Sequence, residues 1–315
     1  MGKTYEVTKA LTENVEKVIV GKNEIIQMIL ASLIAGGHVL LEDAPGTGKT
    51  VMTKAIAKSL QVDFSRIQFT PDLLPSDITG LNIFRQKEGE FEFMKGPIFA
   101  NIVLADEINR ATPRTQSSLL ECMEEKQVTV DGVTYSLDAP FLVIATQNPI
   151  ETAGTFPLPE AQLDRFMMKL SVGFPNKEEE IQLISRFMTE NPLDTLKPVC
   201  AKEDFEMMKE ECKKIFIHPA LREYIVNIVQ ATRNHSSVAL GVSPRGTLAF
   251  VNVLKAYAAM NNRTYVIPED IKKLAKPVMA HRMITYSSVS SGKTEESILD
   301  GILSSVAVPT ENWSE

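Results

Sequence analysis

One short stretch near the start of the chain constrains its fold more than any other, because it sets a glycine-rich turn between an apolar strand and a helix. The pattern predicts a strand over 38–41, a turn through Gly46 and Gly48, and a helix from about Lys49 to Leu60. Such a turn offers backbone N–H groups and the positive end of a helix to an anion. The segment therefore predicts a strand–loop–helix unit that binds phosphate.

The side chains of this loop predict how a nucleoside triphosphate is held. Lys49 is expected to reach the β and γ oxygens, and Thr50 to give its hydroxyl to Mg²⁺. The common pattern G-x-x-x-x-G-K-[ST] begins with glycine, whereas this chain has Asp43 there, which affects the beginning of the loop and not its phosphate-facing end. The alternative is an ordinary strand–helix turn rich in glycine. The expected nucleotide contacts are Asp43, Ala44, Pro45, Gly46, Thr47, Gly48, Lys49, Thr50 and Val51.

Composition limits the remaining possibilities. With 315 residues, 44% of them hydrophobic and 23% charged, the chain is long enough for one large domain and a smaller one. It shows neither a signal peptide nor an apolar run that spans a bilayer, so we expect no membrane insertion. A net charge of −7 argues against a general nucleic-acid surface. The 3 cysteines lack metal-ligand spacing and fit a reducing cytoplasm.

The chain divides into two regions near residue 173. In the first, strand patterns alternate with helical patterns, which predicts an α/β domain with a five-stranded, mostly parallel sheet. The second region is almost entirely helical in pattern. We therefore predict a nucleotide-binding domain over 1–173 and an all-α domain over 174–315. The five predicted strands are 38–41, 66–69, 101–104, 141–146 and 168–172.

Polar side chains follow two of these strands at the sheet edge where ligands bind in open α/β folds. Asp106 is predicted to hold Mg²⁺ through water, and Glu107 to polarise the water that attacks the γ-phosphorus. Asn148 follows the next strand, where its amide is predicted to hydrogen-bond that water or the γ-phosphate. A solvated acidic turn and a turn-forming asparagine before proline are the alternatives.

Two arginines further along the chain are candidates for contact with the γ-phosphate. Arg245 lies in the first turn of a helix capped by Ser243, where its charge opposes the helix dipole by about 0.3–1 kcal/mol unless an anion compensates. Arg165 ends a short helix; at a subunit edge it would reach the γ-phosphate of a neighbour, and otherwise it complements the helix dipole. Arg110 and Arg114 are alternatives for the intersubunit role.

In this order, and followed by a helical region, these features resemble an AAA+ ATPase, and most closely the MoxR family. The closer resemblance lies in segments 107–111, 145–149, 156–166 and 241–245, and it extends over about 18–309. It implies an AAA+ P-loop NTPase core with an all-α lid, and a homo-hexameric ring with ATP bound between subunits. It also implies that Val20 and Gly21 lie near the adenine.

Two hairpins interrupt the first domain, near 81–95 and 127–136, and in AAA+ ATPases such hairpins line a central pore. DNA-translocating rings need basic hairpins there. The first hairpin instead balances Arg85 and Lys87 with three glutamates, and the only charged residue of the second is Asp131. We therefore expect a protein client and no nucleic acid. Three aromatic side chains either contact that client or pack the hairpins: Phe84, Phe91 and Tyr135.

The resemblance implies an ATPase that uses ATP and Mg²⁺ to remodel, assemble or mature a protein partner, as a chaperone does. In the MoxR family the partner often bears a von Willebrand factor A domain. The alternatives are the ATPase subunit of a metal chelatase and a nucleotide-dependent scaffold with negligible hydrolysis.

Overall fold

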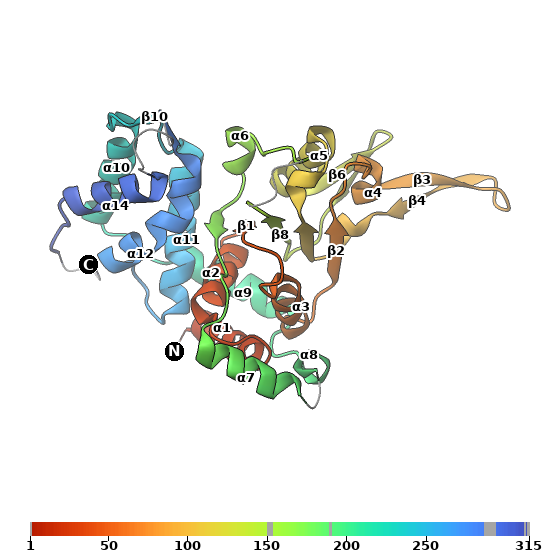
Figure 1. The fold of residues 1–315 in the computed structure, drawn as a ribbon, viewed down its shortest axis with the longest axis horizontal. Helices are drawn as coiled ribbons and strands as arrows, with labels where there is room; N and C mark the ends of the chain where they lie inside the picture. The colour runs from red at the N-terminus through yellow and green to blue at the C-terminus, as the bar shows by residue number, and fades with distance from the viewer. Residues whose placement is uncertain (1, 150–153, 189–190, 287–293, 312, 314–315) are drawn as a thin grey trace.

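The computed structural model describes residues 2–149, 154–188, 191–286, 294–311 and 313. At its centre lies a five-stranded sheet in the order β2-β5-β8-β1-β9, and every pair of neighbouring strands is parallel (Figure 1). The predicted five-stranded parallel sheet is confirmed, with small shifts at the strand ends. The strands are β1 (Val39–Glu42), β2 (Phe64–Gln68), β5 (Ile102–Asp106), β8 (Leu142–Gln147) and β9 (Met168–Leu170).

Burial on both faces explains why the central strands are continuous apolar runs. In β1, Val39 and Leu41 belong to one apolar cluster and Leu40 to another, because successive strand residues point to opposite faces. Helices cover both faces of the sheet. The first face packs against α1 (Lys3–Glu16), α2 (Asn23–Ile34) and α3 (Lys49–Ser59), and the second against α4 (Pro75–Thr79) and α5 (Pro113–Glu125).

A helical unit, the lid, stands beside the sheet domain. Its helix α11 packs on α1, α2 and α12, and the buried side chains of the two units form one apolar cluster. The lid also holds a short antiparallel pair, β10 (Val238–Leu240) with β11 (Ile284–Thr285), whose few residues carry too little alternation to be predicted. The lid helices are α10 (Pro219–Asn234), α11 (Pro244–Met260), α12 (Pro268–Met279) and α14 (Glu295–Ser305).

Three helices that lie between the last strand of the sheet and the lid in the chain contact the sheet domain, and the third of them also packs on the lid helix α11. Arg186 of α7 donates to the carbonyl oxygen of Glu16, and Lys58 of α3 donates to the carbonyl oxygens of Leu193, 2.8 Å, and Asp194, 2.9 Å, in α8. Figure 1 shows α7 and α8 below α1 and α3, away from the lid. The domain boundary near residue 173 stays a prediction. These helices are α7 (Lys177–Phe187), α8 (Pro192–Thr195) and α9 (Lys202–Lys213).

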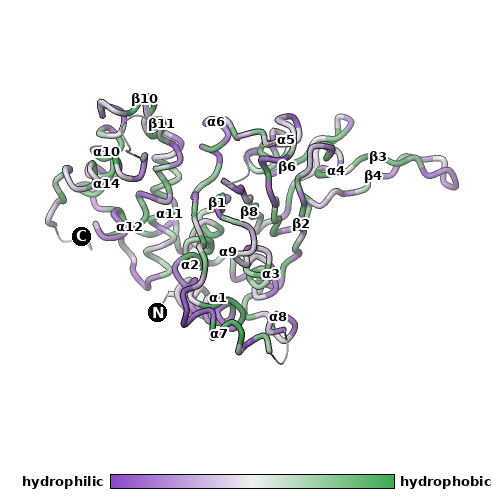
Figure 2. The backbone as a smooth tube through the Cα atoms, viewed as in Figure 1, coloured by the Kyte–Doolittle hydropathy of each residue, from purple (hydrophilic) through white to green (hydrophobic). Residues whose placement is uncertain are grey.

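Both predicted hairpins are present. The pair β3 (Gly80–Arg85) and β4 (Glu90–Lys95) forms an arm that projects from the domain, and its tip is hydrophilic (Figure 2). The second pair is β6 (Gln127–Val130) with β7 (Val133–Ser136). Short helical turns complete the chain: α6 (Glu160–Leu163), η1 (Pro97–Phe99), η2 (Ile108–Arg110) and η3 (Ala280–Arg282).

Side-chain contacts join the base of the first hairpin to the second hairpin. Tyr135 of β7 stacks on Phe93 of β4 with ring centroids 4.2 Å apart, and Asn82 donates to the Asp131 carboxylate at 2.6 Å. Of the aromatics singled out from the sequence, Tyr135 therefore packs the hairpins. Phe84 and Phe91 pair with each other, 5.2 Å between centroids, on the outer part of the arm.

Candidate functional site

The glycine-rich loop lies between β1 and α3 and forms the floor of a cavity of about 390 Å³. Gly46 and Gly48 both have φ of +84°, in the left-handed region that favours glycine. Gly48 immediately precedes α3, so the free N–H groups of the first helical turn face this cavity. The cavity is lined by Asp43, Pro45, Gly46, Thr47, Gly48, Lys49, Thr50, Val51, Arg66, Gln68, Asp106, Glu107, Thr146, Gln147 and Asn148.

Lys49 is held across the loop by main-chain acceptors. Its ammonium group donates to the carbonyl oxygens of Asp43 and Ala44, each at 3.1 Å. Carbonyl oxygens are weaker partners for an ammonium than a charged phosphate is. A phosphate in the loop would therefore take over these bonds with Lys49 at little cost.

Asp43, which stands where the common pattern has glycine, has a structural partner far along the chain. Its carboxylate accepts from Ser171 Oγ at 2.9 Å, from the Gly173 N–H at 3.1 Å, and from the Val172 N–H. Asp43 as a whole residue is 7% exposed. These bonds replace the strand pairing beyond Leu170, which explains why β9 ends two residues earlier than predicted.

The two predicted carboxylates lie at the cavity within a network of side chains. Asp106 pairs with Arg66 of β2 at 2.6 Å and accepts from Thr146 Oγ1 at 2.7 Å. Glu107 has φ of +56°, and its N–H donates to the same threonine oxygen at 2.8 Å. Thr146 therefore fixes both acidic residues from the neighbouring strand.

The Glu107 carboxylate is engaged on one oxygen. Its Oε2 accepts from Gln68 Nε2 at 3.1 Å and from Arg110 Nε at 2.9 Å. Arg110 thus lies in the site of its own chain, and Arg114 is exposed at the beginning of α5. Asn148, 9% exposed, follows β8 and lines the same cavity, as predicted.

Arg66, Gln68 and Thr146 were missed from the sequence. Gln68 and Thr146 lie at the carboxyl ends of β2 and β8, and Arg66 lies in the middle of β2 with its side chain on Asp106. The alternation of Arg66 and Gln68 marks one side of the strand as polar, but only the pairing of β2 with β5 places that side beside the acidic pair.

The donor set fits a magnesium ion. The Thr50 hydroxyl and the Asp106 carboxylate line one cavity, and oxygen atoms of these kinds are preferred Mg²⁺ ligands. Asp106 already holds a cation, the Arg66 guanidinium. The carboxylate is therefore oriented to bind positive charge.

Val20 and Gly21 do not line this cavity. Val20 is buried, and Gly21 has φ of +71° and lies so close to Glu179 of α7 that a Cβ there would collide with that carboxylate. Their contact with the adenine stays a prediction.

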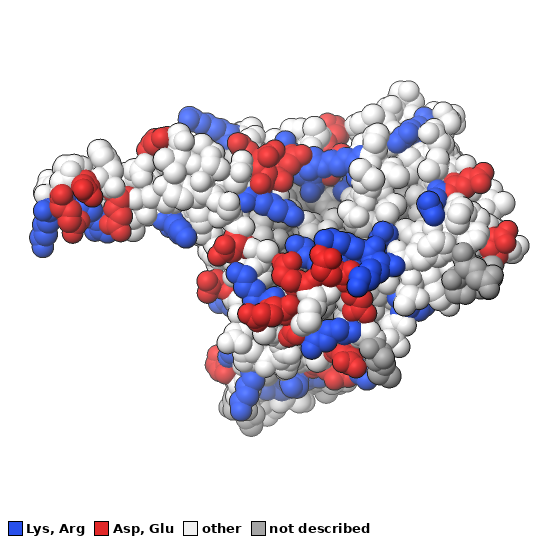
Figure 3. All heavy atoms as spheres, turned by 180° about the vertical axis from the view of Figure 1, so that it is seen from behind, with Lys and Arg blue, Asp and Glu red and all other residues white. Residues whose placement is uncertain are grey.

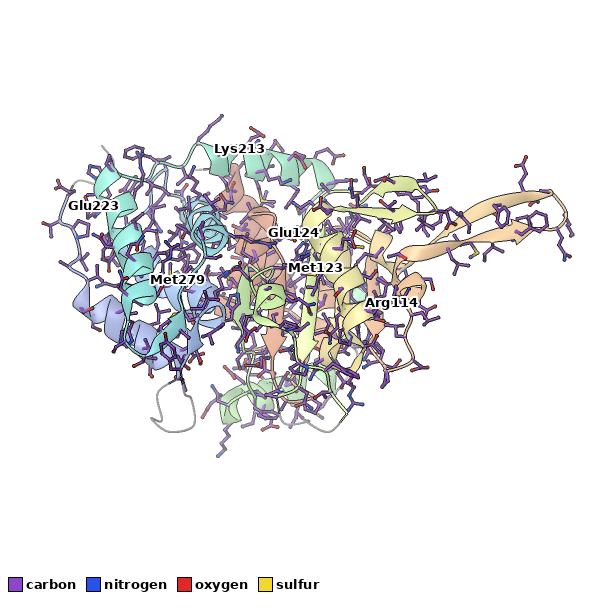
Figure 4. The ribbon with its side chains drawn as sticks, turned by 90° about the horizontal axis from the view of Figure 1, so that it is seen from above. Arg114, Met123, Glu124, Lys213, Glu223 and Met279 are labelled. Carbon is purple, nitrogen blue, oxygen red and sulfur yellow. The ribbon has the colours of Figure 1, made fainter. Side chains whose placement is uncertain are left out.

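The two predicted γ-phosphate arginines meet at a different place, on Glu124 at the end of α5. Arg165 Nη1 lies 2.8 Å from one carboxylate oxygen of Glu124, and Arg245 Nη1 lies 3.1 Å from the other. In Figure 4, Glu124 lies at the end of α5 nearer the lid, and Arg114 marks the other end. Neither Arg165 nor Arg245 lines the cavity of the phosphate loop.

This arginine pair is at the amino edge of the sheet. His38, immediately before β1, joins its neighbours there: its carbonyl accepts from the Met167 N–H at 2.8 Å, and its Nε2 lies 3.0 Å from the Met123 carbonyl. Because Nδ1 accepts from the Val143 N–H at 2.9 Å, Nε2 is the protonated nitrogen. Strands of four or five residues, at about 3.3 Å each, separate this edge from the phosphate loop by roughly 15 Å.

Comparison with known proteins agrees with this geometry. Residues 38–168 match the model of the ATPase family associated with various cellular activities (AAA), and residues 230–302 match the AAA lid domain. The uncharacterized protein YeaC of Bacillus subtilis is 53% identical over 95% of this chain and 94% of its own length. Chaperone MoxR1 of Mycobacterium tuberculosis is 41% identical over 98% of this chain and 84% of its own length. The crystal structure of a candidate ATPase from Cytophaga hutchinsonii is 43% identical and superposes with a TM-score of 0.91, covering 98% of this chain and 97% of that one.

Proposed function

Because the chain belongs to the MoxR family of AAA+ ATPases, we propose that it hydrolyses ATP between the subunits of a homo-hexameric ring and uses the energy to remodel a protein client. The observation that supports this proposal most directly is that two groups of candidate residues lie at opposite edges of the sheet. The phosphate loop and the two carboxylates lie at the carboxyl edge of the sheet, and Arg165 and Arg245 lie at the amino edge.

The phosphate loop and the carboxyl ends of the strands bind the nucleotide. The N–H groups of the loop and the Lys49 ammonium take the phosphates, and Thr50 with Asp106 would hold Mg²⁺. Once bound, the ion offsets the negative charge of the phosphates. Arg66 has to leave Asp106 for this purpose, and its half-exposed side chain, 47% accessible, has room to turn into solvent.

Glu107 and its neighbours catalyse the hydrolysis. Its carboxylate lines the same cavity as the phosphate loop, and it polarises the water that attacks in line. Gln68 and Arg110 hold one of its oxygens, so those bonds have to loosen before the carboxylate turns toward a water. Asn148, at the end of β8, orients the water or the γ-phosphate.

The arginines serve the nucleotide of a neighbouring subunit. Roughly 15 Å of strand separates them from the phosphate loop of their own chain, which is beyond the reach of an arginine side chain. At the subunit boundary they would instead offset the charge that develops on the γ-phosphate in the next subunit. This arrangement favours Arg165, with Arg245, over Arg110 for the role in trans, because the partner of Arg110, Glu107, lines the phosphate-loop cavity of the same chain.

The arm supports a protein client rather than a nucleic acid. Figure 3 shows acidic and basic side chains interleaved near its tip, without a basic surface of one sign. Phe84 and Phe91 are 50% and 72% exposed and give the arm an apolar contact of its own. Following the MoxR resemblance, we take a protein with a von Willebrand factor A domain as the client class.

The proposed cellular compartment is based on the state of the cysteines. All 3 are buried and unpaired, and burial raises the pKa of Cys122 and Cys212 to about 12 and of Cys200 to about 11. Three cysteines without a disulfide support a reducing compartment such as the cytoplasm. Separately, among the described residues no helix combines the length and apolar composition that crossing a membrane requires.

Steady-state phosphate release with Mg²⁺ and ATP tests the proposal. Glu107→Gln is expected to bind ATP as the unchanged chain does and to lose about a hundredfold or more in turnover. Glu125→Gln, on exposed α5 surface, is the matched control and should retain full turnover. Turnover that survives Glu107→Gln would refute the assigned base, and a wild-type ring that releases no phosphate would refute the enzyme in favour of a scaffold.

A further inference from the structure

Glu124 has no place in the motifs that mark the site, yet two candidate catalytic arginines converge on it. Each of its carboxylate oxygens takes one guanidinium, Arg165 at 2.8 Å and Arg245 at 3.1 Å. The arginines come from different parts of the chain, one before β9 and the other from the first turn of α11 in the lid. The Glu124 carboxylate therefore joins the sheet domain to the lid. Neither of these units needs this contact to form its own core.

The backbones that carry these arginines are also fixed to each other. Asp164, next to Arg165, accepts from Ser243 Oγ at 2.9 Å and from Arg282 Nε at 2.7 Å. Ser243 caps α11, whose first turn carries Arg245, and Arg282 is 6% exposed. Asp164 therefore fixes the bases of both arginine side chains, while Glu124 fixes their ends.

Charge and exposure leave this cluster open to an anion. Among the described residues these two guanidiniums share one carboxylate, which leaves one positive charge in excess, whereas Arg282 is neutralised by Asp164. The side chains of Arg165, Arg245 and Glu124 are 31%, 42% and 35% exposed, so they lie at the surface. A guanidinium has five N–H donors, so donors remain on each arginine to face a phosphate after the bonds to Glu124 and the bond from Arg165 to the Leu120 carbonyl oxygen at 3.0 Å.

We propose that Glu124 is a positioning residue, which holds Arg165 and Arg245 side by side so that both reach the γ-phosphate bound by the next subunit. The proposal rests on the proposed function, in which these arginines act in trans. Two long side chains that are ordered before the nucleotide arrives lose less freedom in the transition state. Glu124 acts through the arginines and does not itself touch the nucleotide.

Glu124→Gln and Glu124→Ala test this, with Glu125→Gln on the same helix as the matched control. We expect both Glu124 variants to lower kcat by about tenfold to a hundredfold, while the affinity of each chain for a fluorescent ATP analogue stays unchanged. The affinity is preserved because the phosphate loop of the variant chain is intact. The control should match wild type in both measurements.

Mixed rings separate positioning from a purely structural role. A Glu124→Gln chain keeps its own Glu107, and a Glu107→Gln chain keeps its arginine pair, so equal mixtures should regain turnover that neither variant shows alone. Wild-type turnover in Glu124→Gln, faster turnover, a loss of ATP affinity or no recovery in mixtures would each overturn the inference while leaving the proposed ATPase intact. A wild-type ring without turnover would instead overturn the proposed function.

Discussion

Asp43→Gly gives this chain the glycine that the common phosphate-loop pattern carries, and we expect it to destabilise the protein. The carboxylate that it removes is buried and accepts three hydrogen bonds from residues about 130 positions away, Ser171, Val172 and Gly173. Those bonds connect the beginning of the phosphate loop to the segment that leaves the sheet after β9.

The size of the destabilisation depends on whether water can replace Asp43 as the partner of each hydrogen-bond donor. The Val172 N–H is buried in this contact, and an unsatisfied buried donor costs about 1–3 kcal/mol. The Gly173 N–H is part-buried, so water replaces some of its bond, and the exposed Ser171 hydroxyl turns to solvent at little cost. A new glycine adds about 0.5–1 kcal/mol of backbone entropy. Together these give a loss of about 3 kcal/mol in the free energy of unfolding.

Urea unfolding followed by far-ultraviolet circular dichroism measures this loss. Asp43→Asn keeps one acceptor oxygen but not the charge, so it should fall between wild type and Asp43→Gly, and Asp138→Asn on the exposed surface is the control. Nucleotide binding should survive in Asp43→Gly, because the phosphate-facing residues from Gly46 to Lys49 are unchanged. An Asp43→Gly protein as stable as wild type would show that these bonds contribute nothing to stability.

Three other changes have expected outcomes. Arg66→Gln removes the cation paired with Asp106, a partly exposed pair worth about 1 kcal/mol, so a magnesium titration of ATP binding should shift about fivefold to lower concentration; a shift to higher concentration would contradict the pairing. Burial lowers the pKa of His38 to about 4, so the unfolded chain takes up the proton first, and stability should fall by about 3 kcal/mol as pH drops from 6.5 to 4. His38→Gln should remove that part of the pH dependence in the same unfolding assay. If stability still falls with pH in the same way, a group other than His38 causes the fall. Tyr135→Ala loses the stack on Phe93 and should cost about 1–2 kcal/mol and speed proteolysis of the arm; unchanged proteolysis would show that the hairpins are held otherwise.

Much of the fold could be predicted from local patterns. Glycine at two left-handed positions, the Lys49-Thr50 pair and buried apolar strands are signals that lie within a few residues of each other. Parallel strands place their carboxyl ends at one edge, so Asp106, Glu107 and Asn148 were expected beside the phosphate loop, and they line its cavity.

The partners of these residues could not be predicted, because they are fixed by packing between distant segments. Asp43 is a departure from a motif in the sequence and a buried acceptor for the segment that follows β9 in the structure. Arg66 and Gln68 read as ordinary polar strand residues until β2 is paired with β5.

The sequence by itself determined the phosphate loop, the acidic strand end and the alternation that builds a parallel sheet, since each depends on backbone conformation and side-chain order over a short span. Only the tertiary structure decided that Arg165 and Arg245 meet on Glu124 at the opposite edge from the loop. That placement depends on how the lid packs against α1 and α2, an arrangement of apolar surfaces that no local pattern specifies.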